Sequence, residues 1–337
     1  MHVVYNSAEQ NISDLQVQSQ IDVLNADFSA LNSDYNNYDA GYTTAKGDAN
    51  IQFCLVGVRH VRTSKKSFGA NDQVKRTKQG GDDAIDPMHV MNIWVCNLGQ
   101  NLLGYAQFPG GAVNTFSVVC HYKAFGAGEY NLFPAYNKGR TTTHEIGHCL
   151  GLRHIWGDAT CGNDFVGDTP LHNAANFGCP GEGHLSTCSG NPLEMWMNYM
   201  DYTDDACMYF FSNGQVDRMN FYIDNDPQLN SIVNSGLCGS HPVTSAAVQF
   251  EKASNEFVAY PTITSGLVTV RFHSSVEGVA AIYVYDLRGA MVTGKQFSML
   301  PAFTNQTIDL SKLPNGMYLL QAVQGNRKCL QKIIVQH

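Results

Sequence analysis

In the first 240 residues, the apolar positions follow a helical pattern in some segments and a strand-like pattern in several others. Apolar residues recur at helical spacing over residues 11–31 and predict a long amphipathic helix there; they are Ile12, Leu15, Ile21, Leu24, Phe28 and Leu31. Ser212 and Gln215 form a capping-box pattern that starts a later helix. Alternating or apolar runs predict strands at residues 2–5, 51–58, 89–97, 103–108 and 115–121. This order predicts an α/β (α+β) layer architecture, with a twisted mixed sheet backed by helices and a basic surface loop over residues 59–81.

The pattern changes near residue 240. Residues 240–253 are short of large apolar side chains and are expected to form a linker. Beyond them, residues 254–337 carry short strands separated by Gly, Pro, Asn and Ser, which predicts a small all-β sandwich of immunoglobulin-like type. The predicted strands are 257–260, 268–272, 281–286, 307–310, 318–323 and 329–335. A carbohydrate-binding sandwich is an alternative interpretation of this segment.

Composition favours a folded, exported protein. The chain has 337 residues, of which 44% are hydrophobic and 15% charged, enough for two domains. A net charge of −8 argues against a nucleic-acid partner. No apolar run approaches the roughly 18 residues of a transmembrane helix, so no transmembrane segment is expected. The N-terminal MHVVYNSAEQ lacks the features of a signal peptide, so export would imply that a signal and a propeptide are absent from this chain.

Residues 144–154 read HEIGHCLGLRH and match the zinc signature HExxHxxGxxH. His144 and His148 are four residues apart, so on a helix they project from one face and can hold one metal ion. Gly151 can adopt a positive φ and end the helix, which lets His154 supply the third ligand. A catalytic zinc keeps its fourth position open, and Glu145 is then the candidate general base.

Ten cysteines are many for a reduced cytosolic protein. Cys161, Cys179, Cys188 and Cys207 crowd into the Gly- and Asn-rich stretch after the zinc motif, where two disulfides are expected. Spacing alone leaves all three connectivities open. A second zinc site is the alternative, although the chain has no CxxC pair.

The segment after the zinc motif carries a family resemblance. The continuation MNYMDYTDDACM at residues 197–208, the DTP triplet at 168–170 and the clustered cysteines resemble the pappalysin family of the metzincin clan. The resemblance covers roughly residues 1–240 and implies a metzincin-type catalytic domain at 1–239, with a five-stranded mixed sheet and a zinc-binding active-site helix. It also implies the pairings Cys161–Cys188 and Cys179–Cys207. Cys54 and Cys96 lie in predicted strands and are a further candidate pair.

The same resemblance suggests roles for three residues after the zinc motif. Met200 is expected to form an apolar floor below the histidines, and Tyr202 to place a phenol beside the metal; packing is the ordinary alternative for a tyrosine here. Asp205 stands at the position where the similar enzymes have an aspartate at the bottom of a substrate pocket, the one that receives the residue after the scissile bond. A buried carboxylate there would select Arg or Lys. Asp201 and Asp204 are nearby alternatives that can be solvated or bonded to the turn.

Calcium is expected on the loop between the zinc motif and the methionine. Asp164, Asp168 and Thr169 provide oxygen ligands of the kind that calcium prefers, and the family resemblance also indicates this ion. The alternative is that Asp, Asn and Gly serve only as turn residues here.

The C-terminal segment resembles a different family. YPTITSGLVTV at 260–270, IYVYDLRGAMV at 282–292, IDLSKLPNGMYLLQA at 308–322 and the closing KCLQKIIVQ are similar to the type A sorting domain of the type IX secretion system, with Ile263 in place of the usual proline. The resemblance implies passage through this secretion machinery of a Gram-negative bacterium, followed by surface attachment or release.

Two functional hypotheses follow. The first is a secreted zinc endopeptidase that cleaves proteins or peptides, with a preference for Arg or Lys after the scissile bond. The second is a catalytically silent surface adhesin on a metzincin scaffold. Glu145 discriminates between them, because a structural zinc has no use for a general base.

Overall fold

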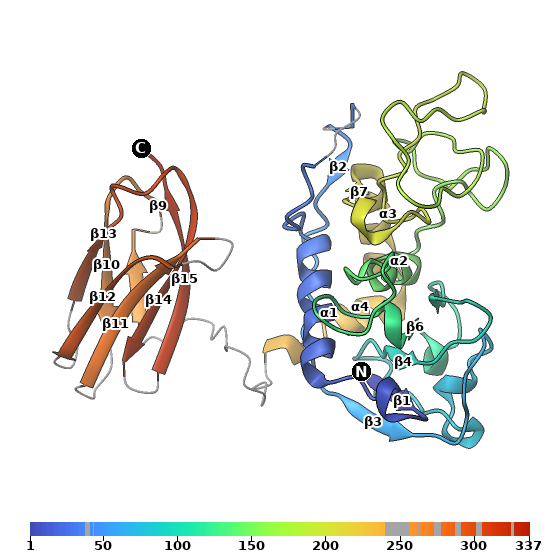
Figure 1. Ribbon diagram of the computed structural model, residues 1–337, viewed down its shortest axis with the longest axis horizontal. Helices are drawn as coiled ribbons and strands as arrows, with labels where there is room; N and C mark the ends of the chain where they lie inside the picture. The colour runs from blue at the N-terminus through green and yellow to red at the C-terminus, as the bar shows by residue number, and fades with distance from the viewer. Residues whose placement is uncertain are drawn as a thin grey trace. The chain divides into compact units, whose positions relative to one another are not determined.

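The computed structural model describes residues 1–37, 41–42, 44–239, 257–261, 263–272, 278–286, 291–300, 305–324 and 327–337. The chain divides into two compact units, Met1–Pro242 and Val243–His337 (Figure 1). The predicted linker at 240–253 lies outside the described residues.

The first unit contains a mixed five-stranded sheet, as expected. Its order is β3-β1-β4-β6-β5, with neighbours parallel except for β5, which is antiparallel to β6 and forms an edge. The strands are β1 (His2–Tyr5), β3 (Arg59–Arg62), β4 (Trp94–Cys96), β5 (Gly104–Ala106) and β6 (Val118–His121). A separate two-stranded sheet pairs β2 (Lys46–Gly47) with β7 (Phe211–Ser212).

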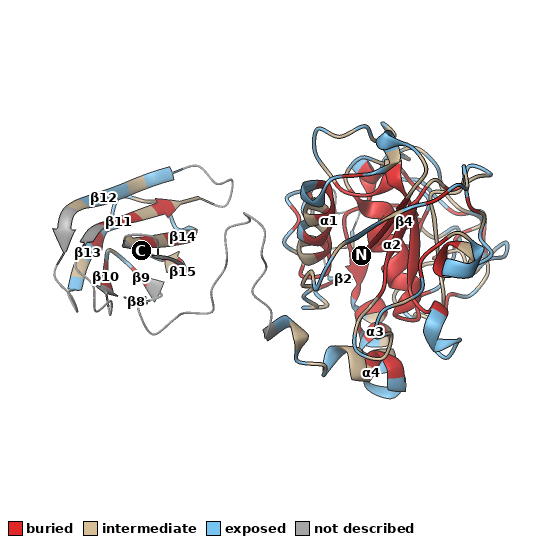
Figure 2. Cartoon of the chain, turned by 90° about the horizontal axis from the view of Figure 1, so that it is seen from below, coloured by how far each residue is buried: buried red, intermediate tan, exposed pale blue. Residues whose placement is uncertain are grey.

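Four α-helices accompany the sheet among the described residues: α1 (Asp14–Asp27), α2 (Arg140–Cys149), α3 (Asn213–Asn225) and α4 (Pro227–Val233). Every residue of α2 is buried, and Figure 2 shows the buried positions gathered on the strands and on α2. Ser212 caps α3 through the predicted capping box with Gln215. Short 3-10 helices lie at Ala8–Gln10, Gln73–Lys75, Thr77–Gln79, Val113–Thr115, Tyr122–Ala124, Asp205–Cys207 and Leu237–Gly239.

Helix α1 is shorter than predicted, and four of the six predicted apolar positions are buried, namely Ile12, Ile21, Leu24 and Phe28. It buries Val17, Ile21 and Leu24, whereas Leu15 and Leu31 are exposed. Helix α4 was not predicted, although Asp226 caps its first turn and Pro227 occupies its first position, which is a recognisable start signal.

The predicted strand at 51–58 is wrong. Its apolar side chains, including Ile51 and Phe53, do pack against the core, but the backbone joins no sheet ladder. Instead, the Asn25 side chain of α1 bonds both backbone groups of Phe53, at 2.6 Å to N and 3.1 Å to O. The partner of β1 is β3, which lies inside the predicted basic loop; Lys75 of that loop is also buried. The predicted strand at 89–97 is likewise reduced to β4.

The second unit is all-β, as predicted. One sheet has the order β13-β10-β8 and the other β12-β11-β14-β15-β9, and side chains from both sheets share a single apolar core. The strands are β8 (Phe257–Tyr260), β9 (Ile263–Thr264), β10 (Leu267–Phe272), β11 (Gly278–Tyr285), β12 (Met291–Leu300), β13 (Asn305–Asp309), β14 (Gly316–Gln324) and β15 (Arg327–Val335). Of these, β9 and β12 were not predicted.

Within the described residues, no helix is both long and apolar enough to cross a membrane.

Candidate active site

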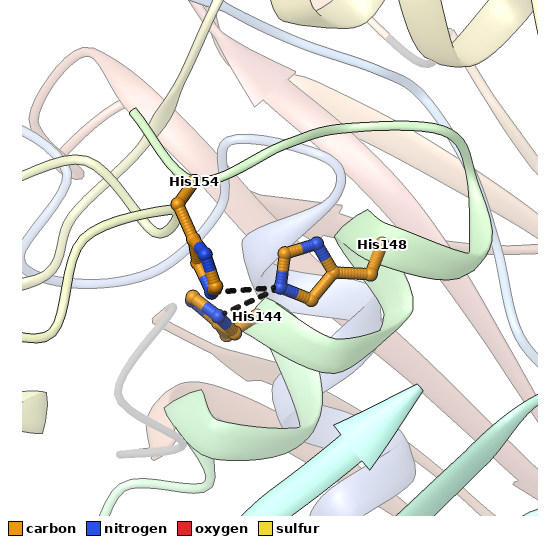
Figure 3. Close-up of side chains that lie close together, drawn as sticks. All are labelled: His144, His148 and His154. Carbon is orange, nitrogen blue, oxygen red and sulfur yellow. Dashed lines mark hydrogen bonds between the residues drawn. The ribbon is translucent and has the colours of Figure 1, made fainter. Parts of the chain in front are cut away.

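The zinc signature folds into a compact group of three imidazoles (Figure 3). His144 and His148 project from one face of α2, and His154 returns toward them from the following segment. The Nε2 atom of His148 lies 3.1 Å from that of His144 and 3.2 Å from that of His154. No other group of three or more His, Cys, Asp or Glu side chains among the described residues is close enough to hold a metal ion.

The return of His154 depends on Gly151. This residue has φ +88°, which an L side chain rarely adopts. A Cβ atom there would lie 2.0 Å from Cδ2 of Tyr222, so α3 also excludes a side chain. Gly151 therefore ends the zinc helix as the sequence predicted.

Each imidazole is oriented by a hydrogen bond through its other nitrogen. The Nδ1 atoms face carbonyl oxygens in two cases, Tyr199 O at 2.7 Å from His144 and Leu152 O at 2.8 Å from His148. The third, on His154, lies 2.5 Å from Oδ1 of Asp158. These acceptors keep the hydrogen on Nδ1 and leave an Nε2 lone pair toward the centre, which is the form that ligates zinc. Three neutral imidazoles with converging Nε2 atoms therefore fit a zinc ion.

Electrostatics favour the same protonation state. Burial and the neighbouring imidazoles lower the pKa of His148 to about 4 and that of His144 well below its usual value. Both rings are therefore neutral at pH 7.

Glu145 is buried beside the imidazoles, and burial raises its pKa to about 8. The edge strand β5 contacts it at Gly104, where an added Cβ would lie 2.8 Å from Oε1 of Glu145. The carboxyl group consequently has room only because residue 104 lacks a side chain.

Met200 and Tyr202 both lie close to the zinc-signature segment. Met200 is fully buried beneath α2, and a Cβ atom on Gly147 would lie 2.5 Å from its Sδ. The hydroxyl of Tyr202 lies 3.0 Å from Nε2 of His154. Burial, followed by the charge of Glu145, raises the pKa of Tyr202 to about 12, so the phenol keeps its proton.

A cavity of about 260 Å³ opens beside His144 and Glu145, and Asp205 lines it. The Oδ2 atom of Asp205 accepts hydrogen bonds from the backbone N–H groups of Lys138, at 2.8 Å, and Arg140, at 3.2 Å. Oδ1 has no hydrogen-bond partner among the described residues. Burial raises the pKa of this carboxyl to about 6. Asp201, the nearby alternative, is fully buried and accepts hydrogen bonds from the N–H of Tyr202 in its own turn and from Asn176.

The three candidate calcium ligands are bonded within the protein. Both carboxyl oxygens of Asp164 accept from the hydroxyl of Thr169, at 3.0 and 2.9 Å. Asp168 accepts from Ser212 Oγ and from the N–H of Gly214, at 2.7 and 2.8 Å, and so holds the start of α3.

Three disulfides are present among the described residues. Cys161 pairs with Cys188 and Cys179 with Cys207, the two pairings that the family resemblance implied. The expectation for Cys54 and Cys96 is wrong, because Cys54 pairs with Cys238 and Cys96 is a buried free thiol. Cys96 lies in a central strand while Cys54 lies outside the sheet, so the two side chains never meet.

Sequence reasoning missed several residues of this site. Asp158, which accepts from His154, stands four residues after it, a spacing that could have drawn attention to it. Trp156 stacks on the His154 ring, with centroids 4.3 Å apart and an interplanar angle of 6°. Gly104 gave no local signal, because its role depends on its contact with Glu145, which lies 41 residues later in the chain.

Comparisons with known proteins agree with this geometry. Residues 70–224 match the family model described as pregnancy-associated plasma protein-A, and residues 258–336 match the secretion system C-terminal sorting domain. An extracellular metalloprotease of Arthroderma gypseum is 30% identical over 230 residues, covering 65% of this chain and 69% of the relative. Another, from Arthroderma benhamiae, is 30% identical over 227 residues, 65% of this chain and 74% of the relative.

Solved structures give a nearer match. Mature mirolysin of Tannerella forsythia, in complex with a cleaved peptide, is 42% identical with a TM-score of 0.67, covering 72% of this chain and 96% of that one. Nothing in these comparisons supports a silent adhesin. The chain therefore belongs to the pappalysin family of metalloendopeptidases and carries a C-terminal secretion sorting domain.

Proposed function

We propose that the protein is a secreted zinc endopeptidase in which Glu145 is the general base and then the general acid. Zinc held by His144, His148 and His154 would lower the pKa of a bound water and polarise the scissile carbonyl. The observation that carries the proposal is the convergence of three Nε2 atoms with Glu145 buried beside them. Glu145 would take the proton of the attacking water and pass it to the leaving amine.

Tyr202 is proposed to stabilise the tetrahedral intermediate. Its hydroxyl lies 3.0 Å from a ligand nitrogen, and its raised pKa keeps the proton that a donor needs. A donor placed where negative charge develops in the transition state accelerates acyl transfer.

The edge strand β5 is proposed to hold substrate as an added strand. His121 N donates to Leu103 O at 2.7 Å, so by the alternation of an antiparallel ladder the backbone groups of Gly104 and Ala106 face the free edge. Gly104 also lines the Asp205 cavity and adjoins Glu145. A peptide paired with this edge would thus pass both groups.

Asp205 is proposed to select Arg or Lys immediately after the scissile bond. Its Oδ1 atom is the acceptor left for a basic side chain that enters the cavity beside Glu145. A charge-assisted bond formed away from water strongly favours such a side chain over a neutral one.

Calcium binding at Asp164, Asp168 and Thr169 remains a proposal. Their oxygens lie on the loop that leads to α3 and already bond to one another or to that helix. A calcium requirement would appear as activity lost to a calcium-selective chelator and restored by calcium with zinc unchanged.

The second unit is proposed to direct the protein through the type IX machinery of a Gram-negative bacterium. The match of residues 258–336 to a secretion sorting domain supports this proposal. The unit is also proposed to have the immunoglobulin-like topology, for which its two sheets around one core provide support.

A peptide library tests the proposed reaction. Wild-type protein should cleave with Arg or Lys enriched after the scissile bond. Glu145→Gln should lower the cleavage rate about 10²- to 10⁴-fold while it still binds zinc. Asp205→Asn should cleave without that enrichment, whereas the matched control Asp204→Asn, one residue away and not in the cavity lining, should keep it. Cleavage by Glu145→Gln at the wild-type rate would overturn the mechanism, and an unchanged profile for Asp205→Asn would overturn the specificity.

A further inference from the structure

A buried polar cluster lies next to the methionine turn and has no part in the proposed chemistry. It consists of His172, Asn176, Glu194 and Asp201. The side chains of His172, Glu194 and Asp201 expose 0%, 1% and 0% of their surfaces. Two carboxylates are therefore held away from water beside one imidazole, which is costly unless each finds partners.

Asn176 supplies most of those partners. Its side-chain Nδ2 donates to Oε2 of Glu194 at 2.7 Å and to Oδ2 of Asp201 at 2.9 Å. Its backbone N–H donates to Oδ1 of Asp201 at 2.8 Å. The amide thus bridges the two carboxylates, and the next residue, Phe177, lines the Asp205 cavity.

His172 occupies the remaining side of the cluster. Its Nε2 accepts a hydrogen bond from the N–H of Met195 at 3.0 Å, so the imidazole is neutral and carries its hydrogen on Nδ1. Nδ1 has no hydrogen-bond partner of standard geometry among the described residues, yet lies 3.5 Å from Asp201 Oδ2 and 3.6 Å from Glu194 Oε2. The ring presents one N–H to both acids. His184 approaches the outer side of Glu194 at 3.5 Å.

The cluster connects to the active site through Asp201. This residue stands between Met200 and Tyr202, and its Oδ1 accepts from the N–H of Tyr202 at 2.8 Å. Tyr202 is 39% exposed, so packing encloses its side chain only in part and the position of its backbone helps to place the phenol. A shift of about 1 Å in a group that serves the transition state can cost about a hundredfold in rate.

We propose that His172 is a positioning residue, which holds Asp201 and through it sets the phenol of Tyr202 for catalysis. The inference rests on the proposed role of Tyr202. Among the described residues, no hydrogen bond, ion pair or ring contact joins His172 to the three histidines of the zinc signature, and His172 does not line the cavity. Its proposed effect therefore runs through Asp201 and the turn.

Two substitutions separate the two nitrogens of His172. His172→Asn places an amide nitrogen near the Nδ1 position and keeps a donor for the carboxylates. His172→Gln reaches the Nε2 position, keeps an acceptor for Met195 and loses that donor. On one fluorogenic peptide, His172→Gln should lower kcat about 10- to 100-fold with KM little changed, and His172→Asn should retain more of kcat. Zinc content and melting temperature are measured for each variant, to show that it is folded and loaded.

A double-mutant cycle with Tyr202→Phe decides the route of the effect. If His172 acts through the phenol, the double variant His172→Gln/Tyr202→Phe should have the kcat of Tyr202→Phe alone. Losses in kcat that multiply, or equal kcat for the Asn and Gln variants, would overturn the inference and leave the role of Tyr202 standing. Wild-type kcat in Tyr202→Phe would overturn the proposed role of Tyr202 and the inference with it.

Discussion

At the residue scale, the site depends on side chains whose surroundings change their ordinary chemistry. Burial lowers the pKa of His144 and His148 and so keeps these two imidazoles neutral, and it raises the pKa of Asp205 to about 6 because its charged form loses hydration. The identity of each residue was readable from the chain, whereas its surroundings were not.

The raised pKa of Asp205 predicts a pH-dependent specificity. Above about pH 6 the carboxyl is charged and attracts a basic side chain; as the pH falls through 6 it becomes neutral and that attraction is lost. The ratio of kcat/KM for a peptide with Arg after the cut to that for a matched peptide with Met should fall about tenfold from pH 7 to pH 5. Titration of enzyme groups that act equally on the hydrolysis of both peptides cancels in this ratio.

Asp205→Asn provides the control for this experiment. For this variant, the ratio of kcat/KM for the Arg peptide to that for the Met peptide should be low and should not vary with pH, because the amide does not titrate. A wild-type ratio that stays constant between pH 7 and pH 5 would contradict the assignment of Asp205 to the pocket.

At the element scale, the contact between β5 and α2 determines where Glu145, the proposed general base, lies. The edge strand passes so close to the helix that Gly104 and Glu145 leave no space for a methyl group. Strand and helix are separate in the sequence, and their approach arises from the packing of α2 against β5 and β6.

Gly104→Ala should therefore impair catalysis with little effect on metal binding. The added methyl would lie 2.8 Å from Oε1 of Glu145 and must displace that carboxyl. We expect a loss in kcat of about 10- to 100-fold at unchanged zinc content, measured by peptide hydrolysis and metal analysis. Gly181→Ala is the matched control, because nothing lies within 4 Å of its added Cβ and its φ is not positive. Equal rates for the two variants would show that Glu145 tolerates the displacement.

At the scale of the whole molecule, all residues of the site belong to the first unit. A long-range disulfide joins parts of this unit that are distant in the sequence. Cys54 and Cys238 are 184 residues apart, whereas Cys161 and Cys188 are 27 apart. A cross-link that closes a longer loop removes more entropy from the unfolded chain.

Removal of Cys54–Cys238 should therefore destabilise the first unit more than removal of Cys161–Cys188. The chain-entropy relation gives about 5 kcal/mol for the longer loop and about 3.5 kcal/mol for the shorter one. Paired Cys→Ala variants can be compared by the urea concentration at which half of the peptidase activity is lost. A larger shift for Cys161–Cys188 would mean that local packing, and not loop closure, dominates the contribution of these bridges.

The sequence by itself determined the local chemistry of this protein. The ligand spacing of His144 and His148, the positive φ of Gly151 and the cap at Ser212 depend on residues a few positions apart, where helix geometry leaves little choice. The tertiary structure alone decided the partner of β1, the bond between Cys54 and Cys238, the contact of Gly104 with Glu145 and the cluster around His172. These are contacts between segments distant in the chain, and the local pattern does not specify them because they depend on how all the elements pack together.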